Sequence, residues 1–418
     1  MKRTIPIRSE NWKPTVSEID RLVAPEHMSS RVRSGQMLST LPPLSIYIHV
    51  PWCIRKCPYC DFNSHEAKGD IPEERYLAAL QADIEQALPD VWGRQVHTVF
   101  IGGGTPSLLS ASAIDRLMGM LRAHFNLWPD AEVTLEANPG AAEAGRFKSY
   151  AESGINRISL GIQTFDDGQL QKLGRVHNGT QARNAIEMAM AAVDRVNLDL
   201  MFALSGQSLE ACMLDAREAL SFGTEHLSIY QLTLEPNTIF AKFPPPLPDD
   251  DLAVSMEEGI ESLLAEAGFD RYEVSAFARH GARARHNINY WQFGDYLGLG
   301  PGAHGKVSFP DRIQREVRLR NPESWMQASV LRNGSQISEK KIVTREDLPF
   351  EFMLNALRLR EGVALDLFDE RTGLSYGDIA ERLALARQKK LLTADPSRLQ
   401  ATDTGWRFLN ELQSIFLS

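Results

Sequence analysis

Three cysteines lie within eight positions of one another, at Cys53, Cys57 and Cys60, in the segment YIHVPWCIRKCPYCDFN. A disulfide framework would use an even number of cysteines spread along the chain, so this clustering indicates metal ligands. A [4Fe-4S] cluster normally takes four thiolates, and three would leave one iron without a protein ligand. S-adenosylmethionine (SAM) can chelate such an iron through its amino and carboxylate groups. An electron from the cluster can then cleave SAM and start radical chemistry.

The three cysteines could instead bind zinc or simply be buried. Zinc prefers four ligands, and His49 or His65 could supply the fourth. Zinc ribbons, however, usually bring pairs of ligands from two distant places in the sequence, which favours the iron–sulfur cluster. The remaining cysteine, Cys212, falls on a helical pattern and is expected to be a small buried apolar residue.

Short apolar runs and helical patterns alternate along the sequence, from a run just before these cysteines to about residue 232. The strand-like runs are 45–50, 97–101, 132–137, 157–161, 196–201 and 226–232, and the helical patterns are 73–88, 111–125, 142–153, 181–192 and 209–222. One unit takes about 31 residues, as in a (β/α)₈ barrel. The sequence therefore predicts an α/β fold, a partial (β/α)₆ TIM-like barrel open on one side, and leaves a doubly wound open sheet as the alternative.

The chain has 418 residues, more than one core usually accommodates, so we expect several units. Residues 1–40 are predicted to be a loosely ordered arm, in which Met28 and Met37 are candidate starts. The barrel core is placed at 41–248. A barrel-closing region at 249–344 is predicted to contain a helix (250–267), a strand (272–278) and a long structured loop (281–312). Residues 345–418 should form a winged-helix-like unit with helices at 348–359, 376–388 and 404–416 and a hairpin at 391–401.

Charge and hydropathy exclude some classes of protein. The net charge of -9 argues against bulk nucleic-acid binding, and Asp378 and Glu381 interrupt the basic residues of the C-terminal unit. We find no apolar stretch long enough to span a bilayer and no apolar core behind the charged N-terminus. We therefore expect a cytoplasmic chain with reduced thiols.

The spacing C-x3-C-x2-C, with Tyr59 before the last cysteine, is the signature of radical-SAM proteins. The segments YIHVPWC, CPYCDFNSH, FIGGGTPSLL, EANPG, ISLGIQTF, LGRVH and NLDLM resemble the anaerobic coproporphyrinogen III oxidase superfamily. Within it they most resemble the heme-chaperone (HemW) family, from about Leu44 to the C-terminus. The resemblance implies a radical-SAM barrel with a [4Fe-4S] cluster on Cys53, Cys57 and Cys60.

The resemblance also implies a SAM site at the ends of the barrel strands. Its residues would be Tyr47, Tyr59, Gly103, Gly104, Thr105, Glu136, Gln163, Arg175 and Asp199. Their types suit the task, because glycines let the backbone approach a ligand closely and an arginine can pair with a carboxylate. Taken singly, each could equally be an ordinary feature: a Gly-Pro turn, a solvated carboxylate, a surface cation or a core aromatic.

The segment HNINYW at 286–291 matches the H-N-x-x-Y-W segment associated with heme binding in the same family. It implies heme contacts by His286, Asn287, Tyr290 and Trp291, since neutral imidazole is a good iron ligand and aromatic rings pack on a porphyrin. The alternative is that this histidine and these rings simply pack in the core. The segment 298–306 also matches the family and is expected to close part of the site, with His304 as a structural residue.

The function that the resemblance implies is a heme chaperone. It would bind heme and transfer it to an acceptor protein, a respiratory enzyme, which would bring the chain to the inner face of the membrane. Its cluster and exchangeable SAM would control assembly or transfer rather than catalyse turnover, and a homodimer is left open.

The rival is a radical-SAM enzyme acting on a tetrapyrrole as an oxidase, a methyltransferase or a heme-opening protein. Phe62 stands where the oxidase has a fourth cysteine, which argues against the oxidase alone. A third alternative is a redox-sensing regulator whose C-terminal unit binds DNA.

Overall fold

A twelve-stranded sheet forms the body of the protein in the computed structural model, which describes residues 37–140 and 144–417. Its strand order is β14-β13-β12-β11-β1-β4-β5-β6-β7-β8-β10-β9. Neighbours from β11 through β8 all pair in parallel. The parallel strands are β11 (Asp295–Leu299), β1 (Leu44–Val50), β4 (Gln95–Gly103), β5 (Asn126–Ala137), β6 (Arg157–Gln163), β7 (Arg195–Phe202) and β8 (His226–Gln231).

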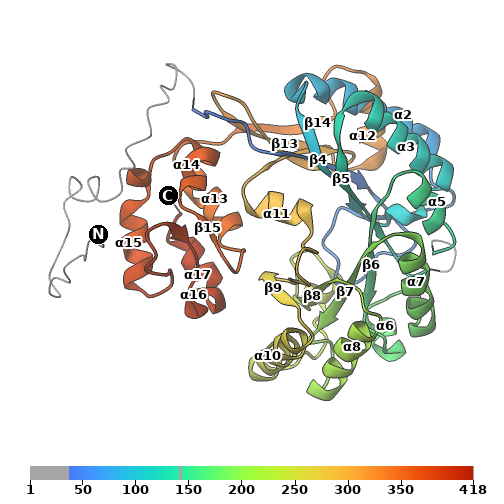
Figure 1. Ribbon diagram of the computed structural model, residues 1–418. Helices are drawn as coiled ribbons and strands as arrows, with labels where there is room; N and C mark the ends of the chain where they lie inside the picture. Colours follow the sequence, from blue (N-terminus) through green and yellow to red (C-terminus); the bar gives the residue numbers. More distant parts are fainter. Residues whose placement is uncertain (1–36, 141–143, 418) are drawn as a thin grey trace.

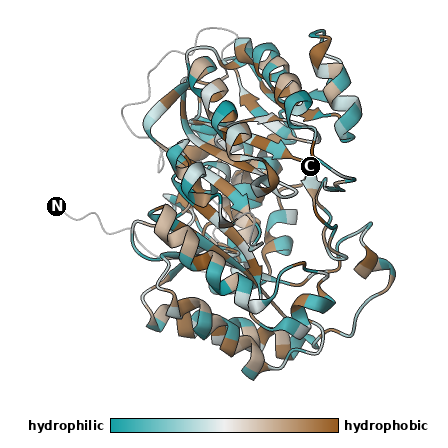
Figure 2. Ribbon diagram, turned by 90° about the vertical axis from the view of Figure 1, so that its right-hand side faces the viewer, coloured by the Kyte–Doolittle hydropathy of each residue, from teal (hydrophilic) through white to brown (hydrophobic). Residues whose placement is uncertain are grey.

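Helices cover the outer side of the curved parallel sheet (Figure 1). They are α2 (Glu73–Ala87), α3 (Ala111–His124), α5 (Phe147–Glu152), α6 (Asp167–Lys172), α7 (Gly179–Ala192) and α8 (Leu209–Ser221). Apolar residues recur along the strands and helices (Figure 2), and residues of both kinds of element form one hydrophobic core. Each of the three helices α3, α7 and α8 begins at a side chain that accepts a hydrogen bond from the first turn, namely Ser110, Asn178 and Ser208. The six predicted strands and the barrel-like α/β fold are confirmed, and at least one helix follows each of the first five strands. Residues 142 and 143, where one predicted helix begins, lie outside the described residues.

The prediction of a long loop at 281–312 is wrong. This stretch contains α11 (Arg285–Trp291), β11 and β12 (His304–Ser308). Strand β11 pairs in parallel with β1 and extends the barrel by a seventh parallel strand. These elements are short and interrupted by glycines, so they carry too few residues for a readable apolar period.

The two edges of the sheet are antiparallel. The single strand predicted at 272–278 is in fact two, β9 (Asp270–Glu273) and β10 (Ala276–Ala278), which pair with each other. At the other edge β12, β13 (Ile313–Arg318) and β14 (Ile337–Ile342) form a meander. The helices α10 (Asp250–Glu266) and α12 (Pro322–Val330) pack beside α8 and α2, respectively.

The C-terminal unit is helical, with a small two-stranded sheet. Its elements are α13 (Leu348–Ala356), β15 (Val363–Ala364), α14 (Asp366–Thr372), α15 (Ala380–Gln388), β16 (Arg398–Leu399), α16 (Asp403–Arg407) and α17 (Leu409–Ser414). The predicted hairpin is incomplete, because β16 pairs with β15 and only a bridge joins Leu392 to Ala401. The sequence prediction also missed α14.

One apolar core links this unit to the barrel side. It contains Phe352 and Phe368 together with Tyr272, Phe293 and Ile313, so the C-terminal unit does not pack as an isolated body. Helix α11 lies between the unit and the barrel strands (Figure 1). Most of the predicted arm, Met28 included, lies outside the described residues. Among the helices that are described, none combines the length and apolar character needed to cross a bilayer.

Candidate functional site

The cysteine loop leaves the carboxyl end of β1 and folds back on itself. Its strands β2 (Trp52–Cys53) and β3 (His65–Glu66) pair in parallel. The Nζ atom of Lys56 donates hydrogen bonds to the carbonyl oxygens of Phe62 and Ser64, at 3.1 and 3.2 Å. A short turn joins the amide of Cys60 to the carbonyl of Cys57 at 3.2 Å. The loop therefore holds its cysteines in one compact arrangement.

The three cysteines line a pocket of about 470 Å³ at the carboxyl ends of the parallel strands. Eight of the nine residues predicted for SAM line the same pocket: Tyr59, Gly103, Gly104, Thr105, Glu136, Gln163, Arg175 and Asp199. The ninth, Tyr47, lies in a neighbouring pocket, so its role toward SAM stays a prediction. The volume falls in the range of cofactor pockets.

The thiols fit a multinuclear cluster. Cys53, Cys57 and Cys60 line one pocket, so three thiolates can reach one cluster there. A cluster spreads its ligands over separate irons. Burial raises the pKa of the Cys53 and Cys60 thiols, so their deprotonated forms depend on bound positive charge.

Backbone crowding explains the glycines after β4. At Gly103, φ is +116°, and a Cβ atom would lie 2.7 Å from the ring of His49. A Cβ atom on Gly104 would lie 2.6 Å from the carbonyl oxygen of Trp52. Any larger residue would displace β1 or the cysteine loop, so these positions require glycine.

Two half-buried carboxyl groups, Glu136 and Asp199, face the pocket from β5 and β7. Burial and then the negative charge of Asp199 raise the pKa of Glu136 to about 8. Asp199 accepts hydrogen bonds from Ser159 at 2.9 Å and Asn197 at 2.8 Å, and burial still raises its pKa. No cation pairs with either group among the described residues. The pair is therefore suited to the hydroxyl groups of a ribose.

Arg175 ties three parts of the pocket together. Its guanidinium donates to Asn138 at 2.5 Å, to the carbonyl of Gly161 at 2.8 Å and to the sulfur of Cys57 at 3.7 Å. Its buried Nε has no partner within the described part of the chain. Gln163 beside it has φ +69°, a conformation that side chains rarely adopt. An unpaired donor on a cation that lines the pocket suits a carboxylate ligand such as that of SAM.

A second pocket of about 570 Å³ adjoins the first. Both are lined by Asp61, Phe62, Gly103 and Glu136. The second pocket is rich in aromatic rings, contributed by Tyr47, Phe62, Phe100, Tyr290, Trp291 and Tyr296. The structure therefore places an aromatic-lined cavity against the predicted SAM pocket.

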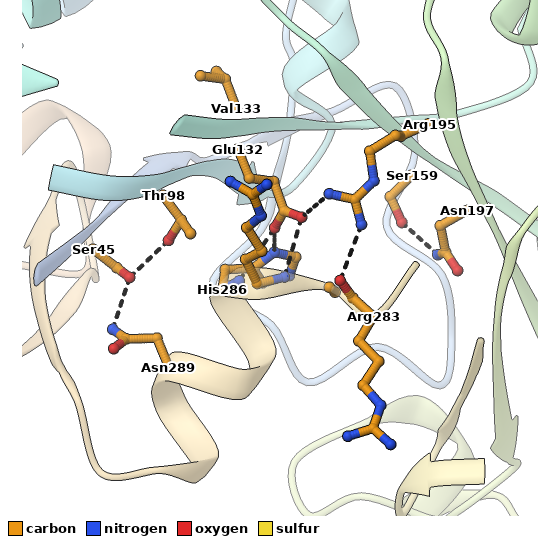
Figure 3. Close-up of polar contacts among 12 residues, drawn as sticks. Ser45, Thr98, Glu132, Val133, Ser159, Arg195, Asn197, Arg283, His286 and Asn289 are labelled. Carbon is orange, nitrogen blue, oxygen red and sulfur yellow. Dashed lines mark hydrogen bonds and ion pairs between the residues drawn. The ribbon is translucent and has the colours of Figure 1, made fainter. Parts of the chain in front are cut away.

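The four residues predicted for heme divide into two pairs. Tyr290 and Trp291 line the second pocket, whereas His286 and Asn287 do not. His286 is 5% exposed, its ring packs 4.4 Å from that of Phe100, and its Nδ1 lies 2.7 Å from Glu132 (Figure 3). Asn287 lies beside the hydroxyl of Tyr272. These two side chains hold α11 in place. This arrangement favours a structural role for His286 over ligation of the heme iron.

The sequence analysis missed the contribution of the sixth strand. Tyr230 and Gln231 at the end of β8, with Thr233 and Glu235 after it, line the first pocket. The rule applied to the other strands, that polar residues at carboxyl ends face the site, would have found them. Met201 also lines the pocket and carries no such signal.

The comparisons with known proteins agree with this geometry. Residues 47–218 match the radical SAM superfamily, and residues 343–408 match the HemN C-terminal domain. The structure of coproporphyrinogen III oxidase (HemN) from Escherichia coli has the same fold, with a TM-score of 0.77 over 90% of each chain at 22% identity. The fold and the cysteine pocket thus define a radical-SAM protein, a class whose cofactors are a [4Fe-4S] cluster and SAM.

Two curated relatives are more specific. The heme chaperone HemW of Haemophilus influenzae is 46% identical over 384 residues, which cover 90% of this chain and 99% of that protein. HemW of Escherichia coli K12 is 46% identical over 380 residues, with the same coverage. The chain belongs to the heme chaperone HemW family.

Proposed function

We propose that this protein is a heme chaperone that binds heme beside a radical-SAM cofactor site and transfers it to an acceptor protein. One observation carries the proposal: an aromatic cavity shares the wall of Phe62, Gly103 and Glu136 with the cysteine pocket. A porphyrin needs a broad apolar cavity, and the shared wall gives the cluster and SAM a direct path to influence heme. The names of the HemW relatives support the same function.

In this proposal Cys53, Cys57 and Cys60 hold the cluster. Glu136 and Asp199 bind the ribose of SAM, and Arg175 orients its carboxylate. The cluster, when bound, supplies an electron donor and an open iron site. Tyr290 and Trp291 contact heme, while His286 and Asn287 position the helix that carries them.

Phe62 favours a chaperone over an oxidase. Its side chain is 62% exposed and borders both pockets. The oxidase pattern has a cysteine at this point, and a phenyl ring can supply neither a thiol nor a proton. An exposed ring between two pockets is instead suited to packing on an apolar ligand.

The acceptor is proposed to be a respiratory enzyme at the membrane, reached from the cytoplasm. No nucleic acid is proposed as a partner. In the C-terminal unit Arg345, Lys389 and Arg360 are engaged by Asp378, Glu411 and Asp403, respectively, which leaves little free positive charge on these side chains.

The test is an anaerobic titration of cluster-loaded protein with heme, followed by incubation with a heme-depleted respiratory oxidase. We expect a Soret band to form on the protein and then oxidase activity to appear. The same protein given SAM, reductant and coproporphyrinogen III should yield no altered tetrapyrrole. A changed tetrapyrrole product would favour the radical-SAM enzyme over the chaperone. Failure of heme to reach the oxidase would contradict the chaperone.

A further inference from the structure

Three histidines lie on or behind the wall of the aromatic pocket, and their ring nitrogens differ in availability. His49 is 4% exposed, with Nδ1 2.8 Å from the hydroxyl of Tyr47 and Nε2 2.9 Å from the carbonyl of Asn63. Both of its nitrogens are therefore occupied. An iron ligand would have to break one of these buried hydrogen bonds, at a cost of about 1–3 kcal/mol.

His286 is no more accessible than His49. Its ring lies behind Phe100, and its Nδ1 is held by the carboxylate of Glu132. Reaching the pocket would require the first turn of α11 to leave β5. The histidine of the HNINYW segment thus has a structural partner already.

His304 differs from both. It is the first residue of β12, it is exposed, and it lines the aromatic pocket. Its ring makes no hydrogen bond or ion pair with any other residue in 37–140 or 144–417. Partial burial, and then the charges of Arg315 and Arg320, lower its pKa. The ring is therefore neutral at neutral pH, which is the form that binds iron.

A free cation lies on the same side of the pocket. Arg320 lines it and is exposed, and its guanidinium forms no ion pair within the described residues. The other nearby arginine, Arg315, is already engaged by Glu351 at 2.7 Å and by the hydroxyl of Tyr296 at 2.8 Å. An unpaired guanidinium at the rim of an apolar cavity suits a carboxylate on the ligand.

We propose that His304 is the axial ligand of the heme iron in the aromatic pocket and that Arg320 pairs with a heme propionate. The inference rests on the proposed function and deepens it, because it replaces His286 by a histidine about 18 positions further along the chain. Tyr290 and Trp291 then contact the macrocycle rather than the iron.

The test compares heme binding by cluster-loaded wild type, His304→Ala, His286→Gln and His280→Ala. His280 is an exposed histidine that lines neither pocket and serves as the matched control. For His304→Ala we expect the Soret maximum to shift and heme affinity to fall about tenfold or more. Added imidazole should restore the wild-type Soret position in this variant. His286→Gln and His280→Ala should keep that position, and cluster absorbance should survive in all four proteins.

The outcomes separate the inference from the function on which it rests. An unchanged Soret band and affinity in His304→Ala would overturn the ligand assignment while heme binding stands. A Soret shift in His286→Gln that added imidazole reverses, with the wild-type band kept in His304→Ala, would do the same and return the ligand to α11. A wild-type protein that binds no heme would overturn the proposed function and the ligand together. For Arg320, Arg320→Ala should weaken binding of heme but not of heme dimethyl ester, whereas equal weakening would remove the propionate contact.

Discussion

Nδ1 of His286 donates a hydrogen bond to the carboxylate of Glu132 at 2.7 Å, and the backbone amide of His286 donates to the same oxygen at 3.1 Å. The two residues are 154 positions apart in sequence. Although burial acts to raise it, the hydrogen bond from His286 and neighbouring positive charge hold the pKa of Glu132 well below its usual value. An ionised carboxylate at the first turn satisfies the free amides of α11. This contact fixes the helix that presents Tyr290 and Trp291 to the pocket.

Replacing His286 by alanine should therefore destabilise the fold. The change leaves Glu132 buried at 2% exposure with one partner fewer, and we expect the free energy of unfolding to fall by about 3 kcal/mol. Urea denaturation of cluster-free protein measures it. His280→Ala, at an exposed site, should change the value by less than about 0.5 kcal/mol. Equal effects in the two variants would show that the Glu132 contact contributes little.

The cluster assignment predicts that iron depends on three thiols and not on the fourth. Replacing Cys53, Cys57 and Cys60 together by alanine should abolish bound iron and acid-labile sulfide after anaerobic reconstitution. Cys212→Ala is the matched control, because this residue is 2% exposed in α8 and lies outside the pocket. Retention of sulfide in the triple variant, or zinc in the wild-type protein, would contradict the cluster.

The sequence predicted the barrel well because its signals are local. The barrel strands from β1 to β8 are rich in buried apolar residues, and three of the following helices, α3, α7 and α8, begin at a capping side chain. The sequence prediction missed α11, β11 and β12 because their positions depend on contacts between distant parts of the chain. Strand β11 is five residues long and owes its place to pairing with β1, a contact across about 250 positions that no local pattern records.

Site residues could be predicted where the carboxyl ends of strands converge. They were harder to predict where a side chain's role depends on which neighbouring group it contacts. Glu136 and Asp199 follow from the rule that carboxyl ends of barrel strands meet at one face. The motif HNINYW, by contrast, does not reveal which histidine faces the cavity. Which histidine faces the cavity depends on Glu132, which accepts a hydrogen bond from the His286 ring. His304 lines the pocket, and its ring has no such acceptor among the described residues.

SAM binding should require the guanidinium group of Arg175 and not only its positive charge. Arg175→Lys keeps the charge but cannot reach Asn138, Gly161 and Cys57 at once. We expect SAM affinity of the cluster-loaded protein to fall about tenfold, measured by calorimetry. Lys172→Arg, an exposed change three positions earlier in the chain, should leave affinity unaltered. A lysine variant that binds SAM as the wild type does would remove Arg175 from the SAM site.

The raised pKa of Glu136 predicts a pH dependence of stability in the cluster-free, SAM-free protein. The folded state keeps this carboxyl protonated up to a pKa of about 8, while the unfolded chain releases the proton near its ordinary pKa of 4.5. Stability from this group is therefore fully present below pH 4.5 and is lost as the pH rises toward 8. Its slope should approach about 1.4 kcal/mol per pH unit.

Glu136→Gln cannot titrate, so its free energy of unfolding should fall less than that of the wild type between pH 6 and 8. Asp215→Asn is the matched control: burial raises the pKa of Asp215 only to about 6, and its removal should flatten the curve mainly below that pH. Urea denaturation at pH 5, 6, 7 and 8 gives both curves. Parallel curves for wild type and Glu136→Gln from pH 6 to 8 would show that Glu136 ionises normally. The pocket would then offer a ribose a charged carboxylate, which can only accept hydrogen bonds, in place of a protonated group that can also donate one.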